Sequence, residues 1–239
     1  MVNNLQRTRG RRMSGDERKE AIVQASLPLF ARQGFASTTT KALAEVSGVS
    51  EALLYKHFPS KASLYTEIQK FGSQESDPLL ERLILMEPST STLVHIIYYM
   101  VRNVAMGKPD ERDGWETRQR LVLNSCLEDG DFLRQLFRNR FSRCFSRVDQ
   151  CFAAAAAAGD LMETPVRREN ALRFAHNVGL ALAAMRLPDR PAIEYQGSAE
   201  SVINQSVWFV LRGVGLKENA INTYFHPKAL AAFYSSANA

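Results

Sequence analysis

The chain lacks the features that mark membrane, secreted and disulfide-stabilised proteins. It contains no run of 18 or more apolar residues, so no membrane-spanning helix is predicted and no membrane partner is expected. Its basic N-terminus is not followed by an apolar segment, which argues against a signal peptide. Three cysteines among 239 residues suit a reducing compartment better than a disulfide framework. A cytoplasmic location is therefore expected.

The signatures of common enzymes are also missing. The sequence has no Gly-rich phosphate loop, no Gly-x-Ser-x-Gly motif and no paired Asp-rich motif, and its four histidines are scattered. Glu128, Asp129 and Asp131 are close together, but they flank Gly130 between two predicted helices and are interpreted as helix caps. A metal site there is the weaker alternative. We expect no catalytic residues, no cofactor and no metal, and an all-helical enzyme is the least favoured class.

Strand-like alternation is equally scarce, and the apolar residues recur at helical spacing almost throughout. The predicted fold class is therefore all-α. Beyond residue 77 we expect a short helix closed by Pro88 and a charged loop from Lys108 to Gly114. Longer helices are predicted at residues 92–106, 115–127, 132–158, 168–187 and 198–216, with one or two short ones between 218 and 235.

Residues 38–61 show the pattern of a helix-turn-helix. Thr39 is a suitable N-cap for a short helix from Lys41 to Val46, and Gly48 stands where a left-handed C-cap is needed. Ser50 then caps a second short helix that extends to His57. A helix held in this way presents its N-terminal half to a DNA major groove. The pattern predicts that the chain reads double-stranded DNA.

Two further helices complete this small domain. One is predicted from Asp16 to Gln33, with a kink near Gln24 caused by Pro28 and with Gly34 as its terminator. The other should run from Ser60 to Phe71. The sequence thus divides into a basic arm at residues 1–13, a helix-turn-helix domain at 14–71 and a larger helical domain at 72–239.

The charge distribution supports nucleic acid as the partner of the smaller domain. Residues 1–71 hold 11 Lys+Arg and 6 Asp+Glu, a net charge of 11 − 6 = +5, whereas residues 72–239 hold 19 of each. A basic module without a basic amphipathic helix favours DNA over a membrane surface. Four arginines (Arg7, Arg9, Arg11 and Arg12) lie in the arm, which either enters a minor groove or is a solvated tail.

The order of residues in this domain resembles the DNA-binding domain of the tetracycline-repressor (TetR) family. The resemblance covers residues 16–70 and rests on Gly34-Phe35, Thr38-Thr39, Leu43-Ala44, Gly48-Val49-Ser50, Leu54-Tyr55, His57-Phe58 and Lys61. It implies a homodimeric regulator with a helix-turn-helix domain and a larger helical-bundle domain for effector binding and dimerisation. Acidic Glu51 and Ala52 depart from the residues that the family usually carries, which leaves the DNA sequence that is read undefined.

The predicted DNA contacts lie at the N-terminal end and exposed face of the second helix and at the starts of the helices beside it. Lys56 is a donor for guanine or phosphate, and Glu51 either accepts from cytosine or points to solvent. The complete predicted set is Thr39, Thr40, Ser50, Glu51, Ala52, Tyr55, Lys56, His57 and Lys61.

The larger domain carries more aromatic residues than a plain bundle needs. They either fill the core or line a cavity for an apolar or aromatic molecule, which the resemblance favours. Arg102, Arg118 and His176 are polar groups on otherwise apolar helices and could anchor a ligand carboxylate or hydroxyl. The complete predicted effector set is Tyr98, Tyr99, Arg102, Trp115, Arg118, Phe137, Phe141, Phe145 and His176.

The helices predicted at 168–187 and 198–216 are apolar over a wide arc. A helix that is apolar on nearly every side must be buried on two faces, so these helices are expected to form a two-fold homodimer interface, with a monomeric core as the alternative. Together these features predict a repressor released from a palindromic operator by a small effector. The alternative is an architectural or chromosome-associated DNA-binding protein of the same fold without an effector.

Overall fold

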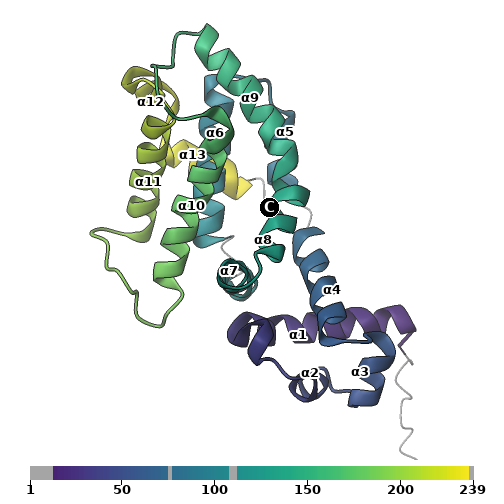
Figure 1. The fold of residues 1–239 in the computed structure, drawn as a ribbon. Helices are drawn as coiled ribbons and strands as arrows, with labels where there is room; N and C mark the ends of the chain where they lie inside the picture. Colours follow the sequence, from purple (N-terminus) through teal and green to yellow (C-terminus); the bar gives the residue numbers. More distant parts are fainter. Residues whose placement is uncertain (1–12, 75–76, 108–111, 237–239) are drawn as a thin grey trace, which may run out of the picture. The chain divides into compact units, whose positions relative to one another are not determined.

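The computed structural model describes residues 13–74, 77–107 and 112–236, and these form a chain of helices (Figure 1). Two compact units are present, residues 1–71 and 72–239. The all-α prediction is confirmed. The described part adds one isolated antiparallel bridge, between Leu161 and Leu216. No helix of this part is long and apolar enough to cross a bilayer.

The first unit contains α1 (Gly15–Ser37), α2 (Thr40–Val46), α3 (Glu51–His57) and most of α4 (Lys61–Gln74). A capping box begins α1, because the Ser14 and Glu17 side chains each accept from the other's backbone N–H. At Pro28 the helix keeps helical dihedrals, and the break lies instead at Gly34 (φ 73°, ψ 173°). The core of the unit consists of Ile22, Leu29, Phe30, Leu43, Leu54, Phe58, Leu64, Tyr65 and Ile68.

The second unit is built around one buried helix, α6 (Thr90–Met106). Figure 1 shows α6 between two pairs of helices, α10 (Arg168–Arg186) with α11 (Ala199–Gly213), and α5 (Pro78–Leu85) with α9 (Ser142–Ala157). Gly179 of α10 permits the closest approach, because a Cβ there would lie 2.9 Å from the Val101 carbonyl oxygen. The remaining helices are α7 (Arg112–Leu127), α8 (Asp131–Leu136), α12 (Glu218–Tyr224) and α13 (Pro227–Ser236).

The single helix predicted for residues 132–158 is wrong. A π-helical turn, η1 (Phe137–Phe141), separates α8 from α9. The buried side chains show the cause, because Phe132 and Leu136 are four residues apart, whereas the next fully buried apolar residue, Phe141, comes five later. An α-helix repeats every 3.6 residues, so the wide turn takes up the extra residue and keeps both apolar faces on the core.

The start of α7 also differs from the prediction. The charged loop expected at 108–114 is shorter than predicted, since helix begins at Arg112, and residues 108–111 lie outside the described part. Trp115, expected at the first turn of that helix, is 7% exposed and its indole N–H donates to the Val104 carbonyl at 2.9 Å. The two short helices expected near the C-terminus are confirmed as α12 and α13.

Candidate nucleic-acid interface

The turn between α2 and α3 is closed at both ends as predicted. Thr39 accepts from the Ala42 N–H at 3.2 Å and caps α2, and Ser50 accepts from the Leu53 N–H at 3.2 Å and caps α3. Gly48 has the expected positive φ of 63°, and the following Val49 N–H donates back to Ala44 at 3.0 Å. Each of these bonds satisfies one backbone group that a helix end leaves unpaired, and together they hold α3 at a defined angle to α2.

The recognition helix α3 has two distinct faces. Leu54 and the following Phe58 are each 2% exposed and anchor the helix to the core of the unit. On the other side, the structure exposes Ala52, Tyr55 and Lys56, and Tyr55 is 46% exposed. A helix held by one apolar face while the opposite face carries a small residue, an aromatic ring and a cation has the form needed to enter a major groove.

A short polar chain links the exposed faces of α2 and α3. The Tyr55 hydroxyl donates to Thr40 Oγ1 at 3.4 Å, and the Thr40 hydroxyl donates to Glu51 Oε2 at 3.3 Å. The sequence predicts that Glu51 either accepts from cytosine or points to solvent, and in the structure it accepts from Thr40. The carboxylate therefore lies beside the start of α2, where it also faces the positive end of its own helix α3.

Lys61 begins α4, in the first turn as predicted, and its side chain has partners within the chain. Its ammonium donates to the carbonyls of Phe35 (2.7 Å) and Thr38 (2.9 Å), contacts that of Ala36 at 3.4 Å, and lies 4.3 Å from the centre of the Phe35 ring. An ammonium has three donors, so these carbonyls occupy it. Lys61 therefore ties α4 to the end of α1, and this side chain is not arranged as a phosphate donor.

Most of the net positive charge of the smaller unit comes from the arm. Residues 13–71 hold seven Lys+Arg and six Asp+Glu, a net charge of 7 − 6 = +1, so four of the five excess charges come from Arg7, Arg9, Arg11 and Arg12. These arginines lie outside the described residues, as does the arm except for Met13. The net positive charge of the unit therefore lies mainly in a segment of 12 residues.

The nine predicted effector residues fall into separate groups. Tyr98 and Tyr99 are buried against Tyr234, and the Tyr99 hydroxyl donates to buried Asp77, which caps α5. Phe137 and Phe141 pack edge-on against His176, with ring centres 4.8 and 5.8 Å away. Phe145 lies under the Arg173 guanidinium at 4.9 Å, and Arg118 is half-buried on α7. Arg102 and Trp115 line the same hollow at the end of α6.

His176 is 2% exposed, and its Nδ1 is one of the buried polar atoms without a hydrogen-bond partner in the described part. Burial lowers the pKa of His176 from 6.5 to about 4, since the apolar surroundings disfavour the imidazolium. Well above pH 6.5 the ring is neutral in both states, so its titration does not affect stability. As the pH falls from 6.5 towards 4, His176 becomes protonated in the unfolded chain but stays neutral in the folded one. The free energy of unfolding therefore falls in that pH range.

We therefore expect the free energy of unfolding to fall by roughly 2 to 3 kcal/mol between pH 7.5 and 4.5 through this residue alone. The measurement is urea unfolding at both values of pH for the wild type and for His176→Phe, which keeps an aromatic ring. Other titrating groups cancel in the difference. An equal loss of stability in both proteins would show that the pKa of His176 is the same in the folded and the unfolded chain.

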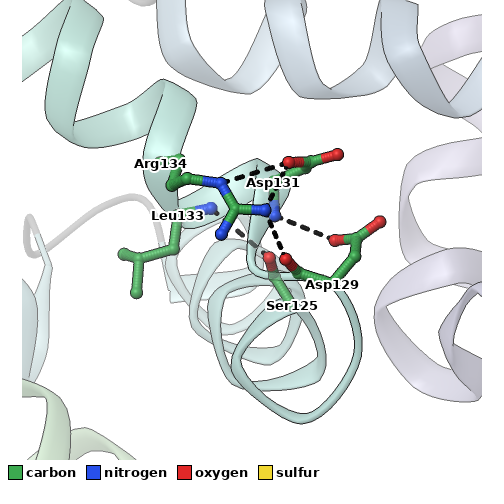
Figure 2. A network of polar contacts seen from close by, with 5 residues as sticks. All are labelled: Ser125, Asp129, Asp131, Leu133 and Arg134. Carbon is green, nitrogen blue, oxygen red and sulfur yellow. Dashed lines mark hydrogen bonds and ion pairs between the residues drawn. The ribbon is translucent and has the colours of Figure 1, made fainter.

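The acidic corner between α7 and α8 is a structural turn (Figure 2). The Arg134 guanidinium donates to the Asp131 carboxylate at 2.6 Å and to the Asp129 carbonyl, and the Asp131 N–H donates to the Asp129 carboxylate at 2.8 Å. Gly130 turns the chain with a φ of 74°. Asp129 and Asp131 are therefore turn residues, whereas the N-cap of α8 is Gly130 and not one of the acids. Among the described residues, no group of three or more His, Cys, Asp or Glu is placed to hold a metal ion.

The helix-turn-helix unit is similar to known bacterial proteins. Residues 22–68 match the family model of bacterial regulatory proteins, tetR family. The nucleoid occlusion factor SlmA of Marinomonas sp. is 32% identical over 94 residues, which are 39% of this chain and 48% of that protein. SlmA of Aliivibrio fischeri is 29% identical over 136 residues, 56% of this chain and 64% of that protein. The chain thus spans between about half and just under two thirds of these relatives.

The fold of the whole chain has a counterpart among solved structures. A bacterial regulatory protein of the tetR family from Rhodococcus RHA1 superposes with a TM-score of 0.60 at 18% identity, covering 84% of this chain and 98% of that one. At this identity the likeness establishes the fold alone. The matched model covers α2, α3 and their caps, which form the DNA-reading element described above. Residues 22–68 are therefore a DNA-binding domain of the tetR family of bacterial regulatory proteins, and the chain has the fold of such a regulator.

Proposed function

We propose that the chain is a homodimeric repressor that binds a palindromic operator and leaves it when a small effector binds residues 72–239. The exposed face of α3 supports the DNA-binding part most directly, because Ala52, Tyr55 and Lys56 project from a helix whose other face is buried. Thr39, Thr40, Ser50 and His57 are proposed as flanking contacts to phosphates or base edges. Residues 14–71 would act as the reading domain and residues 1–13 as its arm.

Dimerisation through α10 and α11 is supported by apolar side chains that remain exposed on both helices. Phe174 of α10 is 49% exposed, and Trp208 and Phe209 of α11 are 41% and 68% exposed. The opposite faces of the same helices pack on α6. Exposed aromatics of this size on two neighbouring helices need cover, and a second copy supplies it with the same surface in a two-fold arrangement.

Phe209→Asp is expected to convert the dimer to monomers and to raise its dissociation constant by at least about a hundredfold, because the interface would have to bury an unpaired carboxylate. Sedimentation velocity at several protein concentrations measures this change. Leu85→Asp is the matched control, since Leu85 is 75% exposed and lies on α5, outside both helices. A variant that remains dimeric would remove α11 from the interface.

The effector would act as a two-state switch. In a dimer, the two recognition helices must lie about 34–36 Å apart to enter successive major grooves. A molecule that binds residues 72–239 only in the other state shifts the protein away from that spacing, by no more than its difference in affinity for the two states. The proposed release from the operator follows from this difference and needs no contact between effector and DNA.

Selection of bound duplexes from a random DNA pool at near-physiological salt tests the proposal. Enrichment of a palindrome with half-sites about one helical turn apart supports a dimeric, sequence-specific regulator. Binding that depends on salt but not on sequence would contradict the proposed operator recognition.

A second candidate is a protein that occupies many chromosomal sites without an effector. The similarity to nucleoid occlusion factors favours it, since the 136 matched residues extend well beyond the 47 residues of the family model. The two candidates differ in how many sites are bound in cells. Chromatin immunoprecipitation that finds one or two sites beside a neighbouring gene supports the repressor, and many sites spread over the chromosome support the alternative.

A further inference from the structure

A hollow of 560 Å³ lies in the second unit where three elements meet. They are the end of α6, the first turns of α7 and the segment that follows α10. This volume falls within the range of small-molecule sites. Its lining consists of Arg102, Met106, Gly107, Arg112, Trp115, Glu116, Arg186, Leu187, Pro188, Asp189 and Pro191.

One wall of the hollow is apolar and rigid. Gly107 (φ 67°) has no side chain, and the Trp115 ring occupies the space beside it, since a Cβ there would lie 2.6 Å from the ring. The Trp115 N–H is already used by the Val104 carbonyl, which fixes the ring, and the small exposed part of this residue (7%) contributes to the wall. Met106, Leu187 and two prolines extend this surface. A flat apolar body would therefore find a preformed wall.

The hollow also gathers positive charge from three elements that are distant in sequence. Arg102 comes from α6, Arg112 from the first turn of α7 and Arg186 from the end of α10. Of the two acids in the lining, Glu116 accepts from Arg120 at 2.9 Å, and Arg120 also donates to the Leu187 carbonyl at 3.1 Å. That pair is neutral, so among the described lining residues three arginines share the hollow with one remaining carboxylate, Asp189. Guanidinium groups bind carboxylates in a bidentate manner.

We propose that this hollow binds a planar aromatic carboxylate, with the ring against Trp115 and the carboxylate on Arg102, Arg112 and Arg186. The inference rests on the proposed function, because it assigns a chemical class and a place to the effector. Of the predicted effector residues, only Arg102 and Trp115 line this hollow. The other aromatic residues of that set are packed elsewhere, so the proposed ligand is held mainly by charge at the end of α6.

The test uses 2-naphthoate and 2-naphthamide, which share ring and shape and differ in charge. Titration calorimetry on the full chain is expected to show naphthoate binding at least tenfold more tightly than naphthamide. Arg102→Gln, Arg112→Gln and Arg186→Gln should each weaken naphthoate binding at least fivefold and leave naphthamide binding unchanged. Equal affinity for both compounds, or no naphthoate binding at millimolar concentration, overturns the proposal.

Two controls locate the binding. Arg190→Gln removes the same charge from the same loop without touching the lining, so it should leave naphthoate affinity unaltered. The chain has two tryptophans, so Trp208→Phe leaves Trp115 as the only indole. Naphthoate should quench that remaining fluorescence with the dissociation constant found by calorimetry. Loss of affinity in Arg190→Gln equal to that in the lining variants, or an unquenched Trp115, would contradict the assigned site.

Operator release separates this site from the proposed function. Naphthoate that binds with the expected arginine dependence but leaves operator affinity unchanged supports the site and contradicts the effector mechanism. Release of the operator that is equally strong in the three arginine variants overturns the site and supports an effector bound elsewhere.

Discussion

Removal of residues 1–12 is expected to flatten the salt dependence of operator binding and to weaken binding by at least about a hundredfold at 0.1 M salt. The segment carries four of the five excess positive charges of the reading unit. Each arginine that neutralises a phosphate contributes about 0.9 to the slope of log K against log salt, so four arginines contribute up to about 3.6 in each protomer. Fluorescence anisotropy with a labelled operator at four salt concentrations measures the slope directly.

A charge-only variant distinguishes the arginines from the length of the arm. Replacement of Arg7, Arg9, Arg11 and Arg12 by Gln keeps the chain and should reproduce most of the loss seen on truncation. The described fold begins at Met13, and α1 starts with its own capping box, so neither change should alter the thermal midpoint. If the slope of log K against log salt is the same in the wild type, the truncated protein and the Gln variant, the arm is a solvated tail.

Tyr55→Ala and Lys56→Ala are each expected to weaken operator binding by about 1 to 3 kcal/mol for each half-site, which in a dimer amounts to roughly 30-fold or more. Both side chains project from the exposed face of α3, whereas Leu54 and Phe58 anchor the helix in the core. Loss of either one should therefore spare the fold. Because Lys56 offers a point charge and Tyr55 a ring, only Lys56→Ala should also reduce the salt slope.

Lys70→Ala is the matched control for Lys56→Ala, since it removes the same charge from the same unit. Lys70 lies near the end of α4 and pairs with Glu67 at 2.8 Å. Its removal should change operator affinity by less than threefold, and circular dichroism should show all variants equally helical. If Tyr55→Ala and Lys56→Ala bind the operator as tightly as the wild type, α3 is not the recognition helix.

The local elements of the reading unit were predictable because their signals are short-range. An N-cap hydroxyl lies three residues before the N–H that donates to it, and a C-cap glycine follows the last helical residue, so both can be seen in the sequence. The caps at Thr39 and Ser50 and the turn at Gly48 are confirmed. The role of Lys61 was not visible. Its carbonyl partners lie 23 to 26 residues away, and only the packing of α4 on the end of α1 brings them together.

The second unit shows why a composition of aromatic residues cannot locate a cavity. Tyr99 satisfies its hydroxyl on Asp77, which begins a different helix, and Trp115 satisfies its indole on Val104. These two aromatic side chains therefore have hydrogen bonds inside the protein that account for their burial. The hollow at the end of α6 depends instead on Gly107 and on a loop that follows α10, neither of which has a helical period in the sequence.

The π-helical turn at Phe137–Phe141 has a consequence for how the length of this chain can vary. Loss of one residue within the turn would leave a continuous α-helix with both apolar faces still on the core. Loss of one residue in the middle of α9 would rotate every later side chain by about 100° and carry Cys151 and Phe152 out of the core. Single-residue insertions and deletions among related sequences should therefore gather at 137–141 and be absent from the helix that follows.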